Sequence, residues 1–409
     1  MKKIILIMTV CLVSCITELP TVPELKIDFR NIMNRTTALS DSTKSRMNGI
    51  YEVIQGSEIL GKKVVCRWLD KRWCIYSNHD VVYSENAGGS IEDTIILTGY
   101  IRVVRSGSGS RIDLSVLPVD GGSELLSDSI PSKIIIRGQT SDGEPITLQR
   151  LKTFYSSSKR FYILAHRGGG RNSERLGYSE NSIEMIMHSE VLGSTGVEID
   201  VKRTRDGQLI LFHDDTFSPR TVKGTYLLGK VENFDLDQIK LLGQLIYGES
   251  IPTLFEALRV VIDSTKLSLV WLDLKDPIIV DETIRIQREA LDYAMANGRD
   301  VQILLGIPDE DVLNAYRSSS LKNTTPILIE LNAETVLSSL NPTCKVWAPR
   351  WTNGIPTGDI SRVQNAGINV FVWTLDVRDF IEDFLYDSEV DGILSNYPSL
   401  VAGMYYSRE

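Results

Sequence analysis

Histidine, cysteine and positive charge are in short supply in this sequence. It holds 4 histidines and 5 cysteines in 409 residues, and 44 lysines and arginines against 53 aspartates and glutamates, for a net charge of −9. Nucleic-acid affinity rests on basic patches, so this balance argues against a nucleic-acid partner. The glycines Gly168–Gly170 open no G-x-G-x-x-G motif, so they are not a dinucleotide-binding fingerprint.

The apolar run near the start of the chain is too short for a stable membrane-spanning helix. It covers residues 4–13 after Lys2-Lys3 and ends in Leu12-Val13-Ser14-Cys15, which resembles a bacterial lipoprotein box. We therefore predict a signal peptide over residues 1–14 and Cys15 as the acylated first residue of the mature protein. A plain secretory signal with an incidental cysteine is the alternative. In both cases the protein is exported, and in the first it is lipid-anchored in the cell envelope.

Three cysteines remain after the predicted processing: Cys66, Cys74 and Cys344. Residues 65–74 have the pattern of a β-hairpin. A three-residue loop would place Cys66 opposite Cys74, within disulfide reach, whereas a two-residue loop would place it opposite Ile75. Cys344 has no evident partner and is predicted to be a buried thiol.

The rest of the composition is that of an ordinary globular protein, with 42% apolar and 24% charged residues, and the length allows two domains. Residues 15–47 are polar and predict a tether with at most one short helix. Residues 48–153 alternate short β-prone runs with glycine- and aspartate-bearing turns, which predicts about six to eight strands in an antiparallel barrel or sandwich. This part is expected to be a spacer or cap, with a ligand-binding or docking module as the alternative.

From residue 160 to 409 apolar strands alternate with helical periodicity, which is typical of a parallel sheet with crossover helices. Nine strand candidates can be counted in the sequence, so one must lie outside an eight-stranded barrel. The pattern alone also permits an open, doubly wound sheet.

Reactive side chains come at the ends of these strands. The run 162–165 ends in His166-Arg167, a second strand carries Glu198 and Asp200, and the run 209–212 ends in His213. Parallel strands deliver catalytic groups in this way, at their carboxyl ends.

The order of these motifs resembles that of the glycerophosphodiester phosphodiesterase family. The chain shows HRG from His166, EN at Glu180-Asn181, ExD at Glu198, then a TxDG turn and HD at His213. Further segments are similar to later strands of that family: Trp271–Lys275, with Asp273 where glutamate is usual, Phe371–Thr374, and Asp391–Pro398, with Ser-Asn where Thr-Asp is usual. The resemblance covers residues 160–400. It implies a closed (β/α)₈ barrel of ~250 residues.

The implied activity is hydrolysis of small glycerophosphodiesters to glycerol phosphate and an alcohol. The family often passes from HRG to EN over a short gap, but here Gly169–Ser179 forms a longer polar loop, which leaves the substrate open. A phospholipase-type or glycan-directed phosphodiesterase, acting through a cyclic phosphate, is one alternative. A non-catalytic ligand-binding lipoprotein with a degenerate barrel is another.

Histidine suits proton transfer in this reaction because its pKa lies near neutrality. His166 and His213 are the predicted acid–base pair, without an assignment of which is which. His188 lies inside a helical pattern and is expected to be structural. His79 sits in a turn and is expected on the surface.

Glu198 and Asp200 are two apart on a strand, so their side chains share a face. A bound cation would relieve their repulsion, with Asp273 as a third ligand and Glu180 either orienting the site or touching the metal. Carboxylate oxygens favour Ca²⁺ or Mg²⁺ over zinc, and the shorter Asp273 favours calcium slightly.

Substrate phosphate would be bound by Arg167 and Lys275, because both can neutralise phosphoryl oxygens. As an alternative to a metal, Lys275 and Lys202 could simply be counter-ions for the lumen carboxylates. Trp373 either lines the substrate pocket or belongs to the core.

Overall fold

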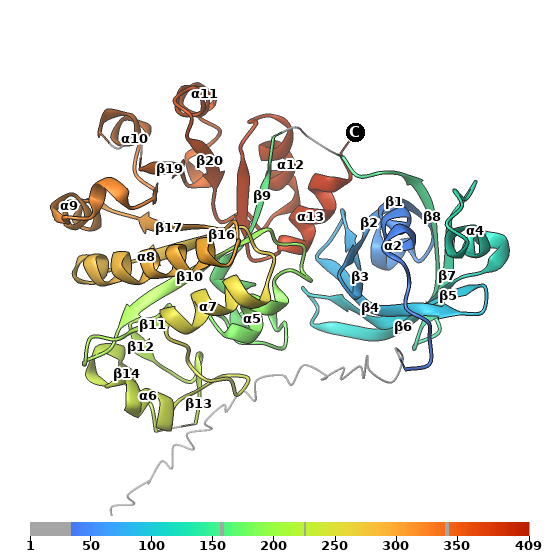
Figure 1. The fold of residues 1–409 in the computed structure, drawn as a ribbon, viewed down its shortest axis with the longest axis horizontal. Coiled ribbons are helices and arrows are strands. Elements are labelled where there is room, and N and C mark those ends of the chain that lie inside the picture. The colour runs from blue at the N-terminus through green and yellow to red at the C-terminus, as the bar shows by residue number, and fades with distance from the viewer. Residues whose placement is uncertain (1–33, 156–158, 225, 340–342, 409) are drawn as a thin grey trace, which may run out of the picture.

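Two barrels lie side by side in the computed structural model, which describes residues 34–155, 159–224, 226–339 and 343–408 (Figure 1). The predicted signal peptide, Cys15 and much of the predicted tether lie outside these residues. Within the described part of the chain, no helix is both long and apolar enough to cross a bilayer.

The smaller barrel is antiparallel and closed, because β1 pairs with both β2 and β8. Its strands are β1 (Gly49–Gln55), β2 (Lys63–Leu69), β3 (Arg72–Ser77), β4 (Val82–Ile91), β5 (Thr94–Val103), β6 (Ser108–Val116), β7 (Ile135–Thr140) and β8 (Pro145–Lys152). The short helices are α2 (Asp41–Met47), α3 (Ser57–Leu60) and α4 (Gly122–Leu126). Side chains such as Tyr51, Trp73 and Ile75 fill its interior, and Met47 of α2 joins the same core.

The β2–β3 hairpin has the two-residue loop, so Cys66 pairs with Ile75 and not with Cys74. Asp70 makes the tight turn possible by taking a left-handed backbone conformation with φ of 51°. Cys66 therefore points into the barrel core, whereas Cys74 points out of the barrel towards the neighbouring domain. Cys66 and Cys74 are both free buried thiols, so the hairpin register that would allow a disulfide between them is excluded. Cys344 is also a free buried thiol, which confirms the prediction.

The larger domain is a closed parallel (β/α)₈ barrel, as the resemblance implied. Its strands are β9 (Tyr162–Ala165), β10 (Gly196–Arg203), β16 (Leu269–Leu274), β17 (Gln302–Ile307), β18 (Ile327–Ile329), β19 (Cys344–Trp347), β20 (Asn369–Val372) and β21 (Gly392–Ser395). The sheet closes because β9 pairs with both β21 and β10. The ninth strand, β11 (Leu209–Leu211), runs antiparallel along β10 and is not part of the barrel. An open sheet is thereby excluded.

Helices cover the outside of this barrel: α5 (Ile183–His188), α7 (Leu254–Ser264), α8 (Val280–Ala296), α9 (Glu310–Ser318), α10 (Ala333–Ser339), α11 (Thr357–Asn365), α12 (Arg378–Tyr386) and α13 (Pro398–Tyr406). The sequence of α7 shows why they form. A capping box between Thr253 and Glu256 starts the helix, and an apolar stripe that includes Leu258 and Val261 is buried against the strands. Leu164, Trp271 and Phe371 are among the side chains that pack inside the barrel.

A small subdomain follows β11 at the mouth of the barrel. It contains β12 (Thr216–Phe217), β13 (Val222–Lys223), β14 (Gly229–Lys230), α6 (Leu236–Leu242) and β15 (Gln244–Leu245), and it has a small core of its own. This segment carries Arg220 towards the strand ends.

The two barrels share one hydrophobic interface. Helix α13 packs against β2, β3 and β4, and Tyr76 and Tyr83 of the small barrel join the core of the large one. Gly403 lies so close to the backbone of Ser77 that a Cβ would have no room there. The contact is thus tight and is independent of the polar contacts described below.

Candidate active site

Three carboxylates converge at the carboxyl ends of two adjacent strands. Asp200 on β10 is in register with Asp273 on β16, and Glu198 lies two residues earlier on the same face as Asp200. Possible ligand atoms of the three residues all lie within 4.8 Å of one another. Within the described part of the chain, Oε1 of Glu198 is buried without a hydrogen-bond partner, as expected of an oxygen that binds a cation. The set therefore fits a divalent metal with oxygen ligands.

The pKa values of these groups show the same crowding. Burial, then the charges of Asp200 and Asp273, raise the pKa of Glu198 well above its usual value. Burial, together with Asp200, raises the pKa of Asp273 to about 6 against the opposing effect of Lys275. Burial acts in the same sense on Asp200, but there the charges of Lys275 and His213 prevail and lower the pKa. A cation would relieve this repulsion.

Lysine charge balances part of this cluster. Nζ of Lys275 lies 2.9 Å from Oδ1 of Asp200 and 3.3 Å from Oδ2 of Asp273. Lys202 pairs with Asp215 instead. Of the two lysines in the counter-ion alternative, only Lys275 meets the triad, and Nε of Arg167 lies 4.0 Å from Oδ2 of Asp200.

The hydrogen bonds of His166 define its tautomer. Asn396 donates from Nδ2 to Oδ2 of Asp376 at 2.6 Å, so its Oδ1 is the acceptor that faces Nδ1 of His166 at 2.8 Å. Nδ1 of His166 accordingly carries the proton, and Nε2 presents a lone pair, 3.8 Å from Oε2 of Glu198. Burial, then Arg167, lower the pKa of His166 to about 4, so the ring is neutral at pH 7.

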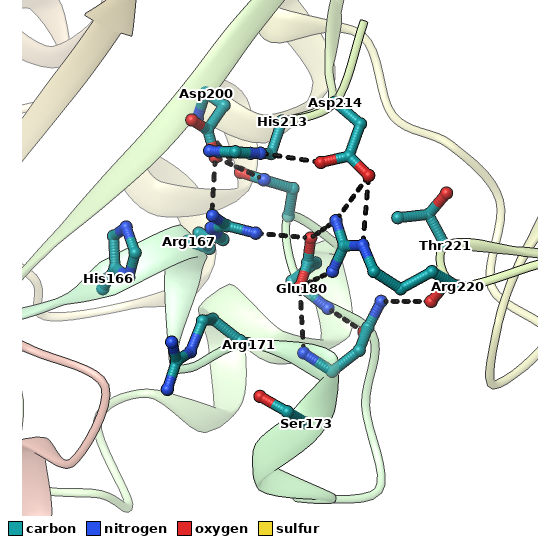
Figure 2. A network of polar contacts seen from close by, with 12 residues as sticks. His166, Arg167, Arg171, Ser173, Glu180, Asp200, His213, Asp214, Arg220 and Thr221 are labelled. Atoms are coloured by element: carbon teal, nitrogen blue, oxygen red, sulfur yellow. Dashed lines mark hydrogen bonds and ion pairs between the residues drawn. The ribbon is translucent and has the colours of Figure 1, made fainter. Parts of the chain in front are cut away.

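His213 is held by a carboxylate. Its Nδ1 donates to Oδ1 of Asp214 at 2.8 Å, and Asp214 is itself held by Nε of Arg220 at 3.0 Å (Figure 2). The carboxylate favours an imidazolium, although burial lowers the pKa of His213. Nε2 is the nitrogen left for chemistry in the adjoining cavity.

Two arginines bind the carboxylate of Glu180. Nη1 of Arg167 donates to Oε1 of Glu180 at 2.9 Å, and both terminal nitrogens of Arg220 donate to the same carboxylate (Figure 2). The cluster of possible metal ligands does not include Glu180. These contacts favour the other predicted role of Glu180, orienting the site.

Arg167 and Asn181 both use left-handed backbone to reach the carboxylates, with φ of 53° and 59°. The N–H of Arg167 donates to Oε2 of Glu198 at 2.7 Å. Asn181 binds Asp200 twice, through its side-chain Nδ2 and Oδ1. Asn181 is not the N-cap of α5, because Ser182 caps that helix by accepting from the backbone N–H of Met185.

A cavity of about 260 Å³ opens between these groups and the far side of the barrel mouth. It is lined by His166, Glu198, His213, Trp271, Asp273, Lys275, Pro308, Glu330, Arg350, Trp373 and Leu394. Trp373 satisfies both expectations: it borders the cavity, and it packs beside Trp271 while donating from Nε1 to the carbonyl of Ala348 at 2.8 Å.

The other two histidines, His188 and His79, do not line this cavity. His188 is buried between the barrels, with Nε2 3.4 Å from the hydroxyl of Tyr83. His79 is exposed. Both lie where the structural expectations placed them.

Six residues of the site had no role assigned from the sequence, although two of them, Asp214 and Asn396, lie in motifs of the resemblance: Asp214, Arg220, Glu330, Arg350, Asp376 and Asn396. Glu330 and Arg350 follow β18 and β19, so a rule that inspects every strand end would have found them. Burial, then Asp273, raise the pKa of Glu330 to about 8. Arg220 lies in an irregular segment and has no such local signal.

A (β/α)₈ barrel whose mouth brings together two histidines, a carboxylate triad and basic side chains defines a phosphoric diester hydrolase. The model of the glycerophosphoryl diester phosphodiesterase family matches residues 166–400. The chain belongs to this family.

Known proteins of the same description align with the large barrel. A glycerophosphodiester phosphodiesterase of Caldanaerobacter subterraneus subsp. tengcongensis is 27% identical over 257 residues, which are 59% of this chain and 96% of that protein. A probable glycerophosphodiester phosphodiesterase 2 of Mycobacterium tuberculosis is 28% identical over 260 residues, 60% of this chain and 90% of its own. A solved glycerophosphodiester phosphodiesterase of Parabacteroides distasonis covers 60% of this chain and 96% of its own at 20% identity, with a TM-score of 0.47.

Proposed function

We propose that this protein hydrolyses glycerophosphodiesters to glycerol phosphate and an alcohol, with a divalent metal held by Glu198, Asp200 and Asp273. The observation that carries the proposal is the carboxylate triad facing two oriented histidines across one small cavity. A cation there would supply Lewis-acid polarisation of the phosphoryl oxygens.

The hydrogen bonds support an assignment of the two histidines. Nε2 of His166, which has the lone pair, takes a proton from the attacking water as the water oxygen bonds to phosphorus. The bond from phosphorus to the leaving oxygen breaks, and that alkoxide receives a proton from Nε2 of His213, whose imidazolium Asp214 stabilises. Lys275 borders the cavity and neutralises charge on the phosphoryl oxygens.

The cavity favours deacylated substrates over intact lipids. It is small, and Lys275, Glu330 and Arg350 give it groups that bind hydroxyls and phosphate. Among the described residues that line it, none comes from the Gly169–Ser179 loop. That loop instead supports the site from the side, since the N–H of Asn172 donates to Oε2 of Glu180.

Calcium is the proposed ion, with magnesium as the other candidate. Calcium accepts variable geometry, whereas magnesium requires near-ideal octahedral distances. The short Asp273 is held by Lys275 as well, so a tolerant ion suits the triad better.

The direct test is hydrolysis of glycerophosphocholine, bis(p-nitrophenyl) phosphate and phosphatidylcholine vesicles, each with calcium, with magnesium and in excess chelator. We expect metal-dependent turnover of glycerophosphocholine and little release from vesicles. Full activity in chelator, or rescue by zinc alone, would refute the proposed metal centre. Faster turnover of the vesicles than of glycerophosphocholine would instead indicate a phospholipase.

We also propose export and anchoring through acylated Cys15. Substitution Cys15→Ala should move the protein from the membrane fraction of the producing cell to the soluble fraction, because it removes the residue that carries the acyl chains, and stable anchoring needs more than one chain. Mass spectrometry of the mature N-terminus checks the cleavage site. Cleavage elsewhere than before Cys15 would contradict the anchor.

A further inference from the structure

The small barrel reaches the catalytic end of the large one through the turn between β5 and β6. Arg105 in this turn donates from Nη2 to the backbone carbonyl of Asp376 at 2.9 Å. Its Nε donates to Oδ1 of Asp80 at 3.1 Å, and its guanidinium lies 4.9 Å from the ring centre of Tyr397. One side chain of the small barrel thus contacts the segments that follow both β20 and β21.

Asp376 is the residue that orients Asn396. Its Oδ1 accepts from the backbone N–H of Asn396 at 2.8 Å and from the hydroxyl of Ser395 at 3.0 Å, while Oδ2 accepts from Nδ2 of Asn396. The amide of Asn396 therefore cannot turn over without breaking its bond to Asp376. Because Oδ1 of that amide accepts the hydrogen bond that Nδ1–H of His166 donates, Asp376 selects the His166 tautomer.

A second contact of the small barrel supports the neighbouring loop. Arg102 on β5 is buried and donates from Nη2 to the carbonyl of Arg175 at 2.7 Å. Arg175 belongs to the Gly169–Ser179 loop, in which the buried Glu174 accepts from the hydroxyl of Tyr397 at 2.7 Å. The small barrel thereby holds Tyr397 from two sides, directly through Arg105 and indirectly through Glu174.

We propose that the small barrel is a positioning element for catalysis, in which Arg105 holds the Asp376–Asn396 pair so that His166 keeps its proton on Nδ1. The inference rests on the proposed function, since it concerns the same histidine. It assigns the small barrel more than a spacer role. Small displacements of a catalytic group are costly, so loss of this support should lower turnover while the fold is kept. The fold should be kept because the two barrels also share a hydrophobic interface that includes Tyr76, Val401 and Ala402.

The test compares Arg105→Ala with Arg111→Ala in the full chain. Arg111 lies on β6 of the same barrel, is exposed, and pairs with Asp113 of its own strand. We expect Arg105→Ala to lower kcat for glycerophosphocholine by about tenfold with KM changed less than twofold. Arg111→Ala should match the wild type, and Arg105→Lys should recover part of kcat because it can still donate to the Asp376 carbonyl.

A double-mutant cycle separates positioning from general loosening. In an Asn396→Ala background the Arg105→Ala change should have little further effect on kcat, because its effect passes through Asn396. Additive losses would overturn the proposal. So would an Arg105→Ala protein with kcat within twofold of the Arg111→Ala protein.

Nitrogen-15 NMR of the histidine rings tests the same inference without any substrate. The wild type should show His166, identified by its loss in His166→Gln, protonated at Nδ1, and Arg105→Ala should show a mixture of the two tautomers. An unchanged tautomer in Arg105→Ala would refute the inference.

The NMR measurement also separates this inference from the proposed function. It tests the tautomer even if the enzyme proves inactive on glycerophosphocholine, and such inactivity would count against the proposed function alone. If Arg105→Ala fails to fold, Asp80→Asn frees Nε of Arg105 and should shift the tautomer in the same direction.

Discussion

Replacing Asp273 by asparagine should change how the stability of the protein depends on pH. Whether the carboxyl group of Asp273 loses or gains stabilising effect as pH rises should depend on whether a metal is bound. Burial and the nearby Asp200 raise the pKa of Asp273 from 3.8 to about 6. A carboxyl group whose pKa is raised on folding binds its proton more tightly in the folded state, so stability is lost as pH rises from about 4 to about 6. A change of that size corresponds to at most about 3 kcal/mol.

The assay is denaturant or thermal unfolding of the wild type and Asp273→Asn at pH 4 to 8, in chelator and in excess calcium. In chelator, the free energy of unfolding of the wild type minus that of the variant should fall between pH 4 and 6 and be level above. In calcium the difference should instead rise with pH, since the bound ion needs the ionised carboxylate. Calcium at about one hundred times its dissociation constant should stabilise the wild type by ~2.7 kcal/mol.

The comparison with the variant cancels the other groups that titrate in this range. A difference that is flat with pH in chelator would refute the repulsion within the triad. A difference that calcium leaves unchanged, or a melting temperature of the wild type that calcium does not raise, would show that Asp273 is not a ligand.

Two further predictions concern the histidines and their partners. His166→Ala and His213→Ala should each lower kcat about 10²- to 10⁴-fold in a glycerophosphocholine assay, whereas His188→Ala should lower the melting temperature with little change in rate per folded molecule; an essential His188 with a dispensable His213 would reverse the site. Asn396→Asp places a carboxylate against Asp376 and should lower kcat ~10- to 100-fold, and adding Asp376→Asn should recover most of it by restoring an amide–carboxylate pair. A double variant no better than the single one would contradict this pairing.

Strand ends made most of the site predictable from the sequence. The spacing of Glu198 and Asp200 fixed a common face, and His166 and His213 each directly followed an apolar run. In contrast, the register of the β2–β3 hairpin depends on whether its loop has two or three residues. The loop has two, and Asp70 takes the left-handed conformation that this tight turn requires. Such a conformation carries no pattern that composition or periodicity could reveal.

Residues that act through other side chains were the ones that sequence reasoning missed or misassigned. Glu180 and Asn181 were placed by motif, but their partners Arg220 and Asp200 lie 40 and 19 positions away. That Glu180 meets arginines and that Asn181 meets Asp200 depends on backbone geometry, here the positive φ of Asn181. The motif therefore identified the right residues and only part of their chemistry.

The charge distribution explains how an acidic protein can act on an anionic ester. Carboxylates hold the site's cations at fixed distances: Glu180 holds Arg167 and Arg220, and Asp200 holds Lys275. Glu180 and Asp214 together balance Arg167 and Arg220, and Asp200 balances Lys275, so the unbalanced negative charge of the site lies on Glu198 and Asp273. Binding of a divalent cation by the triad would cancel this negative charge. Metal binding should thus precede substrate binding, because the repulsion of the phosphate is removed only by that change.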